Sequence, residues 1–320
     1  MVRPAHVELT SSSATPGFIS RSRLRNDHWI DRCFQGATLF FSVVVLLMLA
    51  AILVSLLSGA WPALSKFGFG FLASTQWNPV TGEFGALVPI VGTLITSFIA
   101  LFLTEMCPPA LKRPLGTVIE LLAGIPSIIY GMWGLFVLAP YLADHLQPAL
   151  QKWLGPIPLL GHLFQGPPIG IGMFTASIVL SIMVIPFITA VMRDVFEVVP
   201  PVLKESAYGL GATTWEVVWN VVLPYTKTGV VGGIMLGLGR ALGETMAVTF
   251  VIGNSNRISF SLYESGNSIA SMLANEFAET TTEMHTSSLI ALGLVLFFIT
   301  LVVLVAAKLM LLRLSKREGR

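Results

Sequence analysis

Six stretches of mostly apolar residues, each long enough to cross a bilayer, recur along this chain of 320 residues. A transmembrane helix needs roughly 20 such residues, whereas apolar runs of about 10–14 are typical of helices buried in soluble proteins. Only 11% of the residues are charged, against about 25% in soluble domains. The sequence therefore predicts an all-α membrane protein with six transmembrane helices, at 37–57, 85–103, 117–140, 169–192, 228–252 and 287–312.

Lysine and arginine are distributed unevenly between the two sides that six spans define. Fifteen of them lie in the tails and connections of one side, and three lie on the other, namely Lys66, Lys152 and Arg257. Cytoplasmic segments retain an excess of basic residues, so we expect a multi-pass protein with both termini in the cytoplasm. The net charge of +2 mostly reflects this asymmetry and gives no indication of nucleic-acid binding.

The same topology predicts three regions along the chain. Residues 1–33 are rich in Ser, Thr and Arg, and we expect a cytoplasmic tail that is partly disordered. Residues 34–312 form the six-helix transmembrane domain, and residues 313–320 form a short basic tail on the cytoplasmic side.

Two ionisable residues, Arg240 and Glu244, lie near the middle of the apolar run 228–252. An ionisable group at bilayer depth costs several kcal/mol unless it faces protein or water, so such groups usually belong to a substrate path. Residues four apart share one face of a helix. Arginine suits an oxyanion, because its planar fork donates several hydrogen bonds and never loses its charge. Our hypothesis is that Glu244 neutralises Arg240 until an arriving anion competes for it; a structural ion pair is the alternative.

Glycines at four-residue intervals surround this pair in the same run. Small residues with this spacing let helices approach closely in lipid. The fifth span is therefore predicted to pack within protein, through Gly229, Gly233 and Gly237 and separately through Gly239 and Gly243.

The cytoplasmic connection 193–227 predicts two short helices joined at a glycine, Gly211. Thr213 and Glu216 have capping-box spacing at the start of the second helix, which we expect to end before Pro224. The pair of helices is either an amphipathic linker on the membrane surface or a docking element for a cytoplasmic partner.

This connection resembles the EAA motif of bacterial ABC importer permeases in residue order and spacing. In that family the motif forms the coupling helix, which docks onto an ATP-binding subunit, so the resemblance favours the docking alternative. Ser206 replaces an alanine of the pattern, and Val221 replaces an isoleucine. The matching positions, which we expect to mediate ATPase coupling, are Glu205, Ser206, Ala207, Gly211, Leu223 and Pro224.

Three further stretches, at 85–94, 125–131 and 232–247, are similar to permease subunits of bacterial phosphate importers of the PstC type. The resemblance implies a type I ABC importer permease (MetI-like) fold in the bacterial inner membrane. Phosphate is then the anion that our hypothesis places at Arg240. It also implies a heterodimer with a homologous PstA-type permease subunit, two ATP-binding subunits and an external phosphate-binding protein. One departure is that family members have additional residues where this chain has 97–105, which shortens the cytoplasmic extension of the second span.

No Gly-Lys pair occurs in the sequence, so there is no Walker A loop, and ATP hydrolysis is expected on another polypeptide. Two isolated cysteines and five scattered histidines predict neither a metal site nor a disulfide, and we expect the histidines in solvated loops. No cofactor is expected. Three acidic residues of the last outer connection are expected to be solvated or to face the binding protein: Glu276, Glu279 and Glu283.

Three alternative functions stay open at this stage. The shortened second span is compatible with a transport-impaired subunit that acts in phosphate sensing. One arginine would also serve a permease for sulfate or molybdate. A secondary anion transporter working without ATP would require an internal repeat or broken helices at corresponding positions of two halves.

Overall fold

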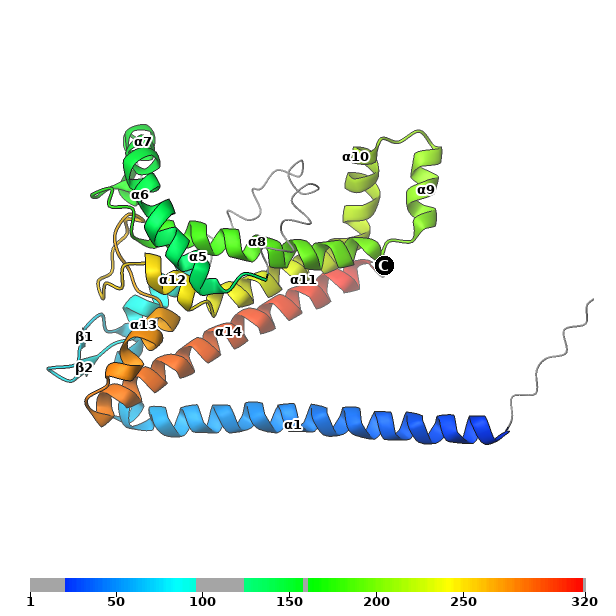
Figure 1. Ribbon diagram of the computed structural model, residues 1–320, viewed down its shortest axis with the longest axis horizontal. Helices are drawn as coiled ribbons and strands as arrows, with labels where there is room; N and C mark the ends of the chain where they lie inside the picture. Colours follow the sequence, from blue (N-terminus) through cyan, green and yellow to red (C-terminus); the bar gives the residue numbers. More distant parts are fainter. Residues whose placement is uncertain (1–20, 96–123, 158–160, 319–320) are drawn as a thin grey trace, which may run out of the picture. The chain divides into compact units, whose positions relative to one another are not determined.

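The computed structural model describes residues 21–95, 124–157 and 161–318, and the chain divides into a first unit, Met1–Val54, and a second unit, Ser55–Arg320. The second unit contains almost all of the elements (Figure 1). In chain order the elements are α1 (Arg21–Phe67), α2 (Gly70–Ala73), β1 (Trp77–Asn78), β2 (Glu83–Phe84), a helical segment at 87–95, α5 (Ser127–Trp133), η2 (Gly134–Leu138), α6 (Ala139–Tyr141), η3 (Leu142–Leu146), α7 (Gln147–Leu154), η4 (Gly161–Phe164), α8 (Met173–Glu197), α9 (Pro201–Gly209), α10 (Thr214–Val217), η5 (Val218–Val222), α11 (Leu223–Leu242), α12 (Met246–Val251), α13 (Ile269–Glu276), η6 (Phe277–Glu279) and α14 (Glu283–Glu318).

The first unit consists of the N-terminal part of α1, which begins at Arg21 and therefore inside the segment 1–33 that was expected to be a tail. Its described side chains are almost all exposed, and most of them are apolar. A helix that is apolar all round suits contact with lipid or with other transmembrane helices. The first 20 residues lie outside the described part of the chain.

Five helical segments of the described chain are long and apolar enough to cross a membrane. They are Arg32–Phe67, Ser127–Leu154, Met173–Glu197, Thr214–Leu242 and Glu283–Arg313. The predicted second span, 85–103, begins as a helix at 87–95, and its remainder lies outside the described residues together with the shortened stretch 97–105. The all-α membrane class is confirmed, apart from the small antiparallel hairpin β1–β2, whereas the count of six spans is not reached in the described chain.

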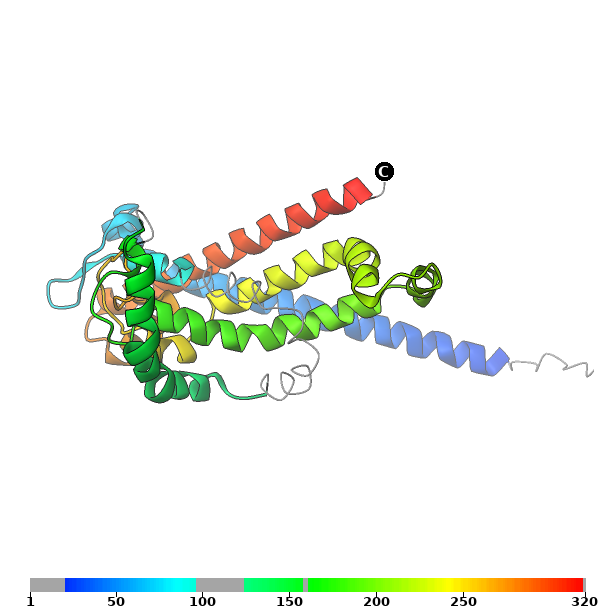
Figure 2. The same cartoon turned by 90° about the horizontal axis from the view of Figure 1, so that it is seen from above.

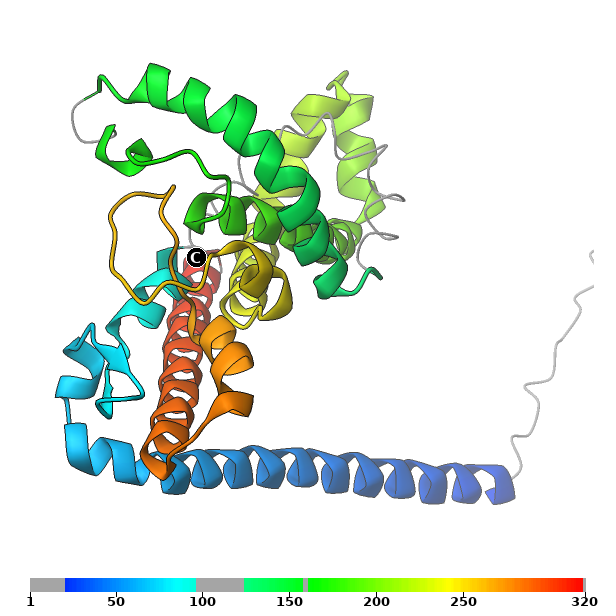
Figure 3. The same ribbon diagram turned by 60° about the vertical axis from the view of Figure 1, so that its left-hand side comes forward.

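Within the second unit, α8 is the central helix. It packs along α11, and α11 packs in turn on α14, as the view from above shows (Figure 2). Helix α12 lies against α5 and α8, and the side chains that meet there, such as Val179, Leu180 and Val251, form the main buried core. Helix α13 lies beside the start of α14 (Figure 3).

Three π-helical turns mark prolines that the chain accommodates without ending a helix. The turns η2, η3 and η5 end at Leu138, Leu146 and Val222, and in each case a proline follows two residues later, namely Pro140, Pro148 and Pro224. A proline lacks an N–H and its ring clashes with the carbonyl four residues earlier. That carbonyl belongs to the π turn in all three cases, and the wider turn gives the ring room.

These turns explain why the third and fifth predicted spans have wrong boundaries. The third was predicted at 117–140, but its described helix begins after Pro126 and continues through two prolines to Leu154. The second short helix of the connection 193–227, which was expected to end before Pro224, likewise runs without interruption from Thr214 into α11. Figure 1 shows α10 bent away from α11 at this point, as expected where a proline and a π turn occur together.

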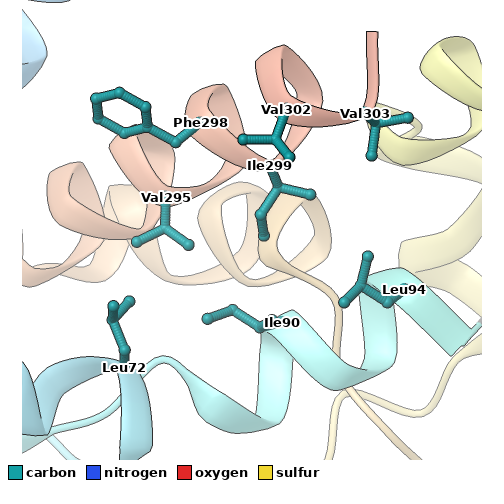
Figure 4. A pocket seen from close by; sticks show the side chains of 8 residues that line it. All are labelled: Leu72, Ile90, Leu94, Val295, Phe298, Ile299, Val302 and Val303. Atoms are coloured by element: carbon teal, nitrogen blue, oxygen red, sulfur yellow. The ribbon is translucent and has the colours of Figure 1, made fainter. Parts of the chain in front are cut away.

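A groove between α2, the segment 87–95 and α14 has only apolar side chains around it (Figure 4). An oxyanion needs hydrogen-bond donors or positive charge, so this groove is not suited to phosphate. Its lining suits lipid chains or an apolar helix: Leu72, Ile90, Leu94, Val295, Phe298, Ile299, Val302 and Val303.

Gly92 allows the helical segment 87–95 to touch the loop before α13. A β-carbon at Gly92 would lie 1.8 Å from the carbonyl oxygen of Asn267, and the neighbouring Thr93 hydroxyl accepts a hydrogen bond from the Ile269 N–H at 2.9 Å. Because the clash is with backbone, Gly92→Ala is expected to lower the free energy of unfolding by about 1–3 kcal/mol or more. The measurement is the Tm of the purified protein in detergent. Gly232→Ala is the matched control, since its β-carbon would meet only Leu311 at 3.8 Å, and an unchanged Tm for Gly92→Ala would refute this account.

Candidate functional site: the α8–α11 pair and the α9–α10 hairpin

Three of the predicted glycines lie where α11 and α8 are in closest contact. An added β-carbon would lie 2.6 Å from Val195 at Gly229, 2.7 Å from Met192 at Gly233 and 2.6 Å from Ile188 at Gly237. A side chain larger than hydrogen at these positions would force the α8 side chains to shift, so the glycines allow the close approach of the two helices.

The other two predicted glycines have different surroundings. A β-carbon at Gly239 would make an ordinary contact with Leu304 of α14 at 3.4 Å. At Gly243 it would meet only carbonyl oxygens of its own segment, at 4.0 Å. Gly243 lies just beyond the last residue of α11, so its place is at the end of a helix and not in a helix contact.

Arg240 lies in the last turn of α11, and its side chain is exposed on the surface of the single chain. Its guanidinium carbon is 5.8 Å from the centre of the Phe187 ring on α8. An exposed arginine within an apolar helix requires water or a second protein chain next to it, because lipid would not accept the charge. The position therefore suits the wall of a polar path.

Glu244 lies in a break of the fifth span. Helix α11 ends at Leu242 and α12 begins at Met246, so the predicted single span 228–252 consists of two helices. The Glu244 carboxylate is half-buried and accepts a hydrogen bond of 3.4 Å from the Ala247 N–H, in the first turn of α12.

The break changes the relation between the two charged residues. We expected Arg240 and Glu244 to share one helix face, and this is wrong, because the helix ends between them. Among the described residues, no ion pair joins them. A backbone hydrogen bond from the Glu244 N–H to the Ala241 carbonyl, 3.3 Å long, keeps the carboxylate close to the end of α11.

The predicted coupling region is a hairpin of two short helices, α9 and α10, at the end of α8 and α11 (Figure 1). Gly211 joins them with a φ of +88°, a conformation that strongly favours glycine. The capping box is confirmed, since the Glu216 N–H donates to the Thr213 hydroxyl while the Thr213 N–H donates to the Glu216 carboxylate at 2.8 Å.

The base of the hairpin has its own small core. Val199, Val217 and Val222 are buried there, and Ala207 of α9 packs against them. Lys204 adds a hydrogen bond of 3.2 Å to the carbonyl of Phe196 at the end of α8. These contacts hold the hairpin to the ends of the two long helices.

The outer surface of the hairpin is rich in exposed residues, including Glu205 and Ser206. Leu210 is 90% exposed, and Trp215 and Trp219 stack on each other with ring centres 5.7 Å apart while remaining 56% and 58% exposed. Exposed apolar groups gathered on one element are typical of a contact with another protein or with the membrane surface. Leu223 and Pro224, the end of the predicted motif, lie at the start of α11.

The expectation that every histidine is a solvated loop residue is wrong for His285. Its ring is 3% exposed and stacks on Phe84, with ring centres 5.2 Å apart. Its Nε2 lies 3.0 Å from Glu276 Oε2, the oxygen that also accepts a 2.6 Å hydrogen bond from Trp77 Nε1. One residue of the predicted acidic cluster therefore ties the β1–β2 hairpin to α13 and α14, whereas Glu279 and Glu283 are exposed.

Another buried contact fixes the loop that follows α12. The Tyr263 hydroxyl donates a 2.8 Å hydrogen bond to the carbonyl of Gln147 in α7. Burial raises the pKa of Tyr263 to about 12, so the phenol keeps the proton that it donates. Neither His285 nor Tyr263 has a sequence signal that distinguishes it from a solvated residue.

Comparison with known proteins finds relatives that are components of transport systems. Residues 92–317 match the model of the family described as "Binding-protein-dependent transport system inner membrane component". The chain is 58% identical over 307 residues to the phosphate transport system permease protein PstC of Pasteurella multocida, covering 92% of this chain and 96% of that protein. It is 55% identical to the protein of the same name from Mesorhizobium japonicum, over 90% of this chain and 92% of that protein.

More distant relatives are similar over most of the chain as well. A probable PstC protein of Methanocaldococcus jannaschii is 37% identical, over 84% of this chain and 90% of that protein. Among solved structures, an inward-facing form of the MetNI methionine ABC transporter is similar with a TM-score of 0.48 and 15% identity, over 73% of this chain and 95% of that one. From the family match and the sequence identities, this chain belongs to the family of inner-membrane components of binding-protein-dependent transport systems, among its PstC permease proteins.

Proposed function

We propose that this chain is a permease subunit of an ATP-driven phosphate importer and forms half of the path across the membrane. The observation that supports phosphate most directly is the identity of 58% and 55% to two phosphate transport system permeases over at least nine-tenths of the chain. ATP hydrolysis belongs to a separate subunit, because the chain has no Walker A loop.

The proposed assembly contains a homologous PstA-type permease subunit, two ATP-binding subunits and an external phosphate-binding protein. Arg240 supports the heterodimer, because an exposed arginine at this depth needs a polar neighbour that the single chain does not provide in its described part. The exposed apolar side chains of the α9–α10 hairpin support the docking of an ATP-binding subunit. Both termini, and hence this hairpin, lie in the cytoplasm in the proposed orientation.

Arg240 is the proposed contact for phosphate in the path, and Glu244 is the proposed counter-charge beside it. The guanidinium offers N–H donors in a geometry that matches phosphate oxygens. The Glu244 carboxylate repels an anion, so it limits how tightly phosphate is held next to Arg240. Weak holding is required, because a transported ion must leave its site again.

The experiment is reconstitution of this chain with its partner subunits and its binding protein in lipid vesicles. We expect phosphate, delivered by the binding protein, to stimulate ATP hydrolysis and to accumulate in the compartment on the ATPase side. Sulfate and molybdate are the comparison anions. If either of them is transported and phosphate is not, the substrate assignment is wrong; ATP hydrolysis with no transport would indicate a sensing subunit.

A further inference from the structure

The side chain beneath the Arg240 guanidinium is an aromatic ring from the neighbouring helix. Phe187 lies on α8, and its ring centre is 5.8 Å from the guanidinium carbon. This distance is within the ~6 Å at which a cation is attracted by the negative face of a ring. Phe187 is half-buried against the main core cluster, so its position is restricted, whereas Arg240 is exposed.

The close contact of the two helices brings these side chains together. Gly237 lies one turn before Arg240, and its missing side chain lets α11 approach Ile188, the residue next to Phe187. Residues three apart lie on neighbouring positions of one helix surface. Arg240 is therefore positioned beside the ring by the close contact between α8 and α11 at Gly237.

The Phe187 ring restricts the position of the Arg240 side chain, as an ion pair with a carboxylate would otherwise do. A long arginine side chain has many rotamers, and ordering it when an anion arrives reduces affinity. A ring attracts the guanidinium electrostatically and, unlike a carboxylate, has no oxygen that accepts hydrogen bonds from its N–H groups. The N–H groups at the edge remain available for phosphate oxygens, which a carboxylate partner would occupy.

We infer that Phe187 is a positioning residue for substrate passage, which orients the Arg240 guanidinium toward the anion through a cation–π contact. This inference rests on the proposed function, since it assigns Phe187 a role only if Arg240 contacts phosphate. It also explains how Arg240 is held while Glu244 is engaged at the start of α12.

The experiment is phosphate uptake by cells that lack their own importer and contain this chain with its partner subunits. The variants are Phe187→Leu, which removes the ring, and Phe187→Tyr and Phe187→Trp, which keep it. Phe250→Leu is the matched control, because Phe250 packs against the same core cluster but is not the ring under Arg240. Uptake is measured per assembled transporter, with the Tm of the purified complex determined in parallel.

We expect Phe187→Leu to lower the maximal uptake rate by roughly 2- to 30-fold, which is the change in rate that corresponds to the loss of one cation–π contact. The phosphate concentration at half-maximal rate should change little, because the binding protein determines it. Phe187→Tyr, Phe187→Trp and Phe250→Leu should transport at close to the original rate. The Tm of these three variants and of Phe187→Leu should be similar. A purely structural role for Phe187 would instead lower the Tm of Phe187→Leu together with its uptake rate, because leucine fills less of the space next to the core cluster.

Two outcomes overturn the inference: wild-type uptake by Phe187→Leu, or an equal loss in Phe187→Tyr and Phe187→Leu. Arg240→Ala in the same assay separates this result from the proposed function. If Arg240→Ala transports normally, the proposed path is wrong. If Arg240→Ala loses uptake and Phe187→Leu does not, only the role of Phe187 is rejected.

Discussion

Arg240→Ala is expected to reduce phosphate uptake at least about 100-fold while the transporter still assembles. The guanidinium is proposed to donate two or more hydrogen bonds to phosphate, and hydrogen bonds to charged groups contribute about 1.5–3 kcal/mol each. Because the side chain is exposed in the single chain, its removal should leave the packing of α11 on α8 intact. The measurement is phosphate uptake together with phosphate-stimulated ATP hydrolysis of the reconstituted complex.

The controls for this prediction separate charge from geometry. Arg240→Lys keeps the charge but not the planar fork, so uptake should be intermediate. Glu244→Gln keeps the size and the hydrogen-bonding capacity of the side chain near Ala247 while removing the proposed counter-charge. Transport that survives Arg240→Ala, with only a lower Tm, would mean that the residue is structural and does not line the path.

Leu210→Asp is expected to weaken the association with the ATP-binding subunit by about 10- to 100-fold. The residue is 90% exposed between α9 and α10, so the substitution should not affect folding. Burying a leucine in an interface stabilises it by about 1.5–3 kcal/mol, and a carboxylate would remain unpaired there. The measurement is the amount of ATP-binding subunit that copurifies with the chain at a series of dilutions.

Val80→Asp is the matched control for the docking surface. Val80 is 94% exposed in the turn of the β1–β2 hairpin, in a connection proposed to lie on the other side of the membrane. The ATP-binding subunit should therefore copurify normally with this variant. If Leu210→Asp binds as well as the unsubstituted chain does, the hairpin tip is not part of the docking surface.

Hydropathy and residue spacing predicted the membrane class, most spans and the hairpin with Gly211 and its capping box. Span boundaries at prolines were less accurate, because a π turn before Pro140, Pro148 or Pro224 lets the helix continue. Hydropathy does not register such a turn, since it depends on backbone geometry. The end of α11 at Leu242 was missed for the converse reason, because the residues after it are apolar enough to extend a span.

The candidate site was predictable in part. Arg240 and Glu244 were identified because charged residues are unusual in an apolar run. Their four-residue spacing predicted a shared helix face, which is wrong because the helix ends between them. Phe187 had no signal of its own, because one phenylalanine in an apolar helix is ordinary and its relation to Arg240 depends on the register of two helices. The burial of His285 could not be predicted either, since it depends on the fold that brings Phe84 and Glu276 into contact with its ring.

The helix that starts in the α9–α10 hairpin also ends at the proposed phosphate contact. Thr214–Leu242 is continuous but bends at the π turn before Pro224, and from there α11 extends about 26 Å to Arg240 without an intervening loop. A rigid-body movement of a docked ATP-binding subunit would therefore reach Arg240 as a mechanical displacement, and the bend at the π turn before Pro224 would absorb part of it. Glu244 follows the end of α11 and is held to it by the hydrogen bond to the Ala241 carbonyl, so the same displacement would move both charges and would strain the contact of the Glu244 carboxylate with α12.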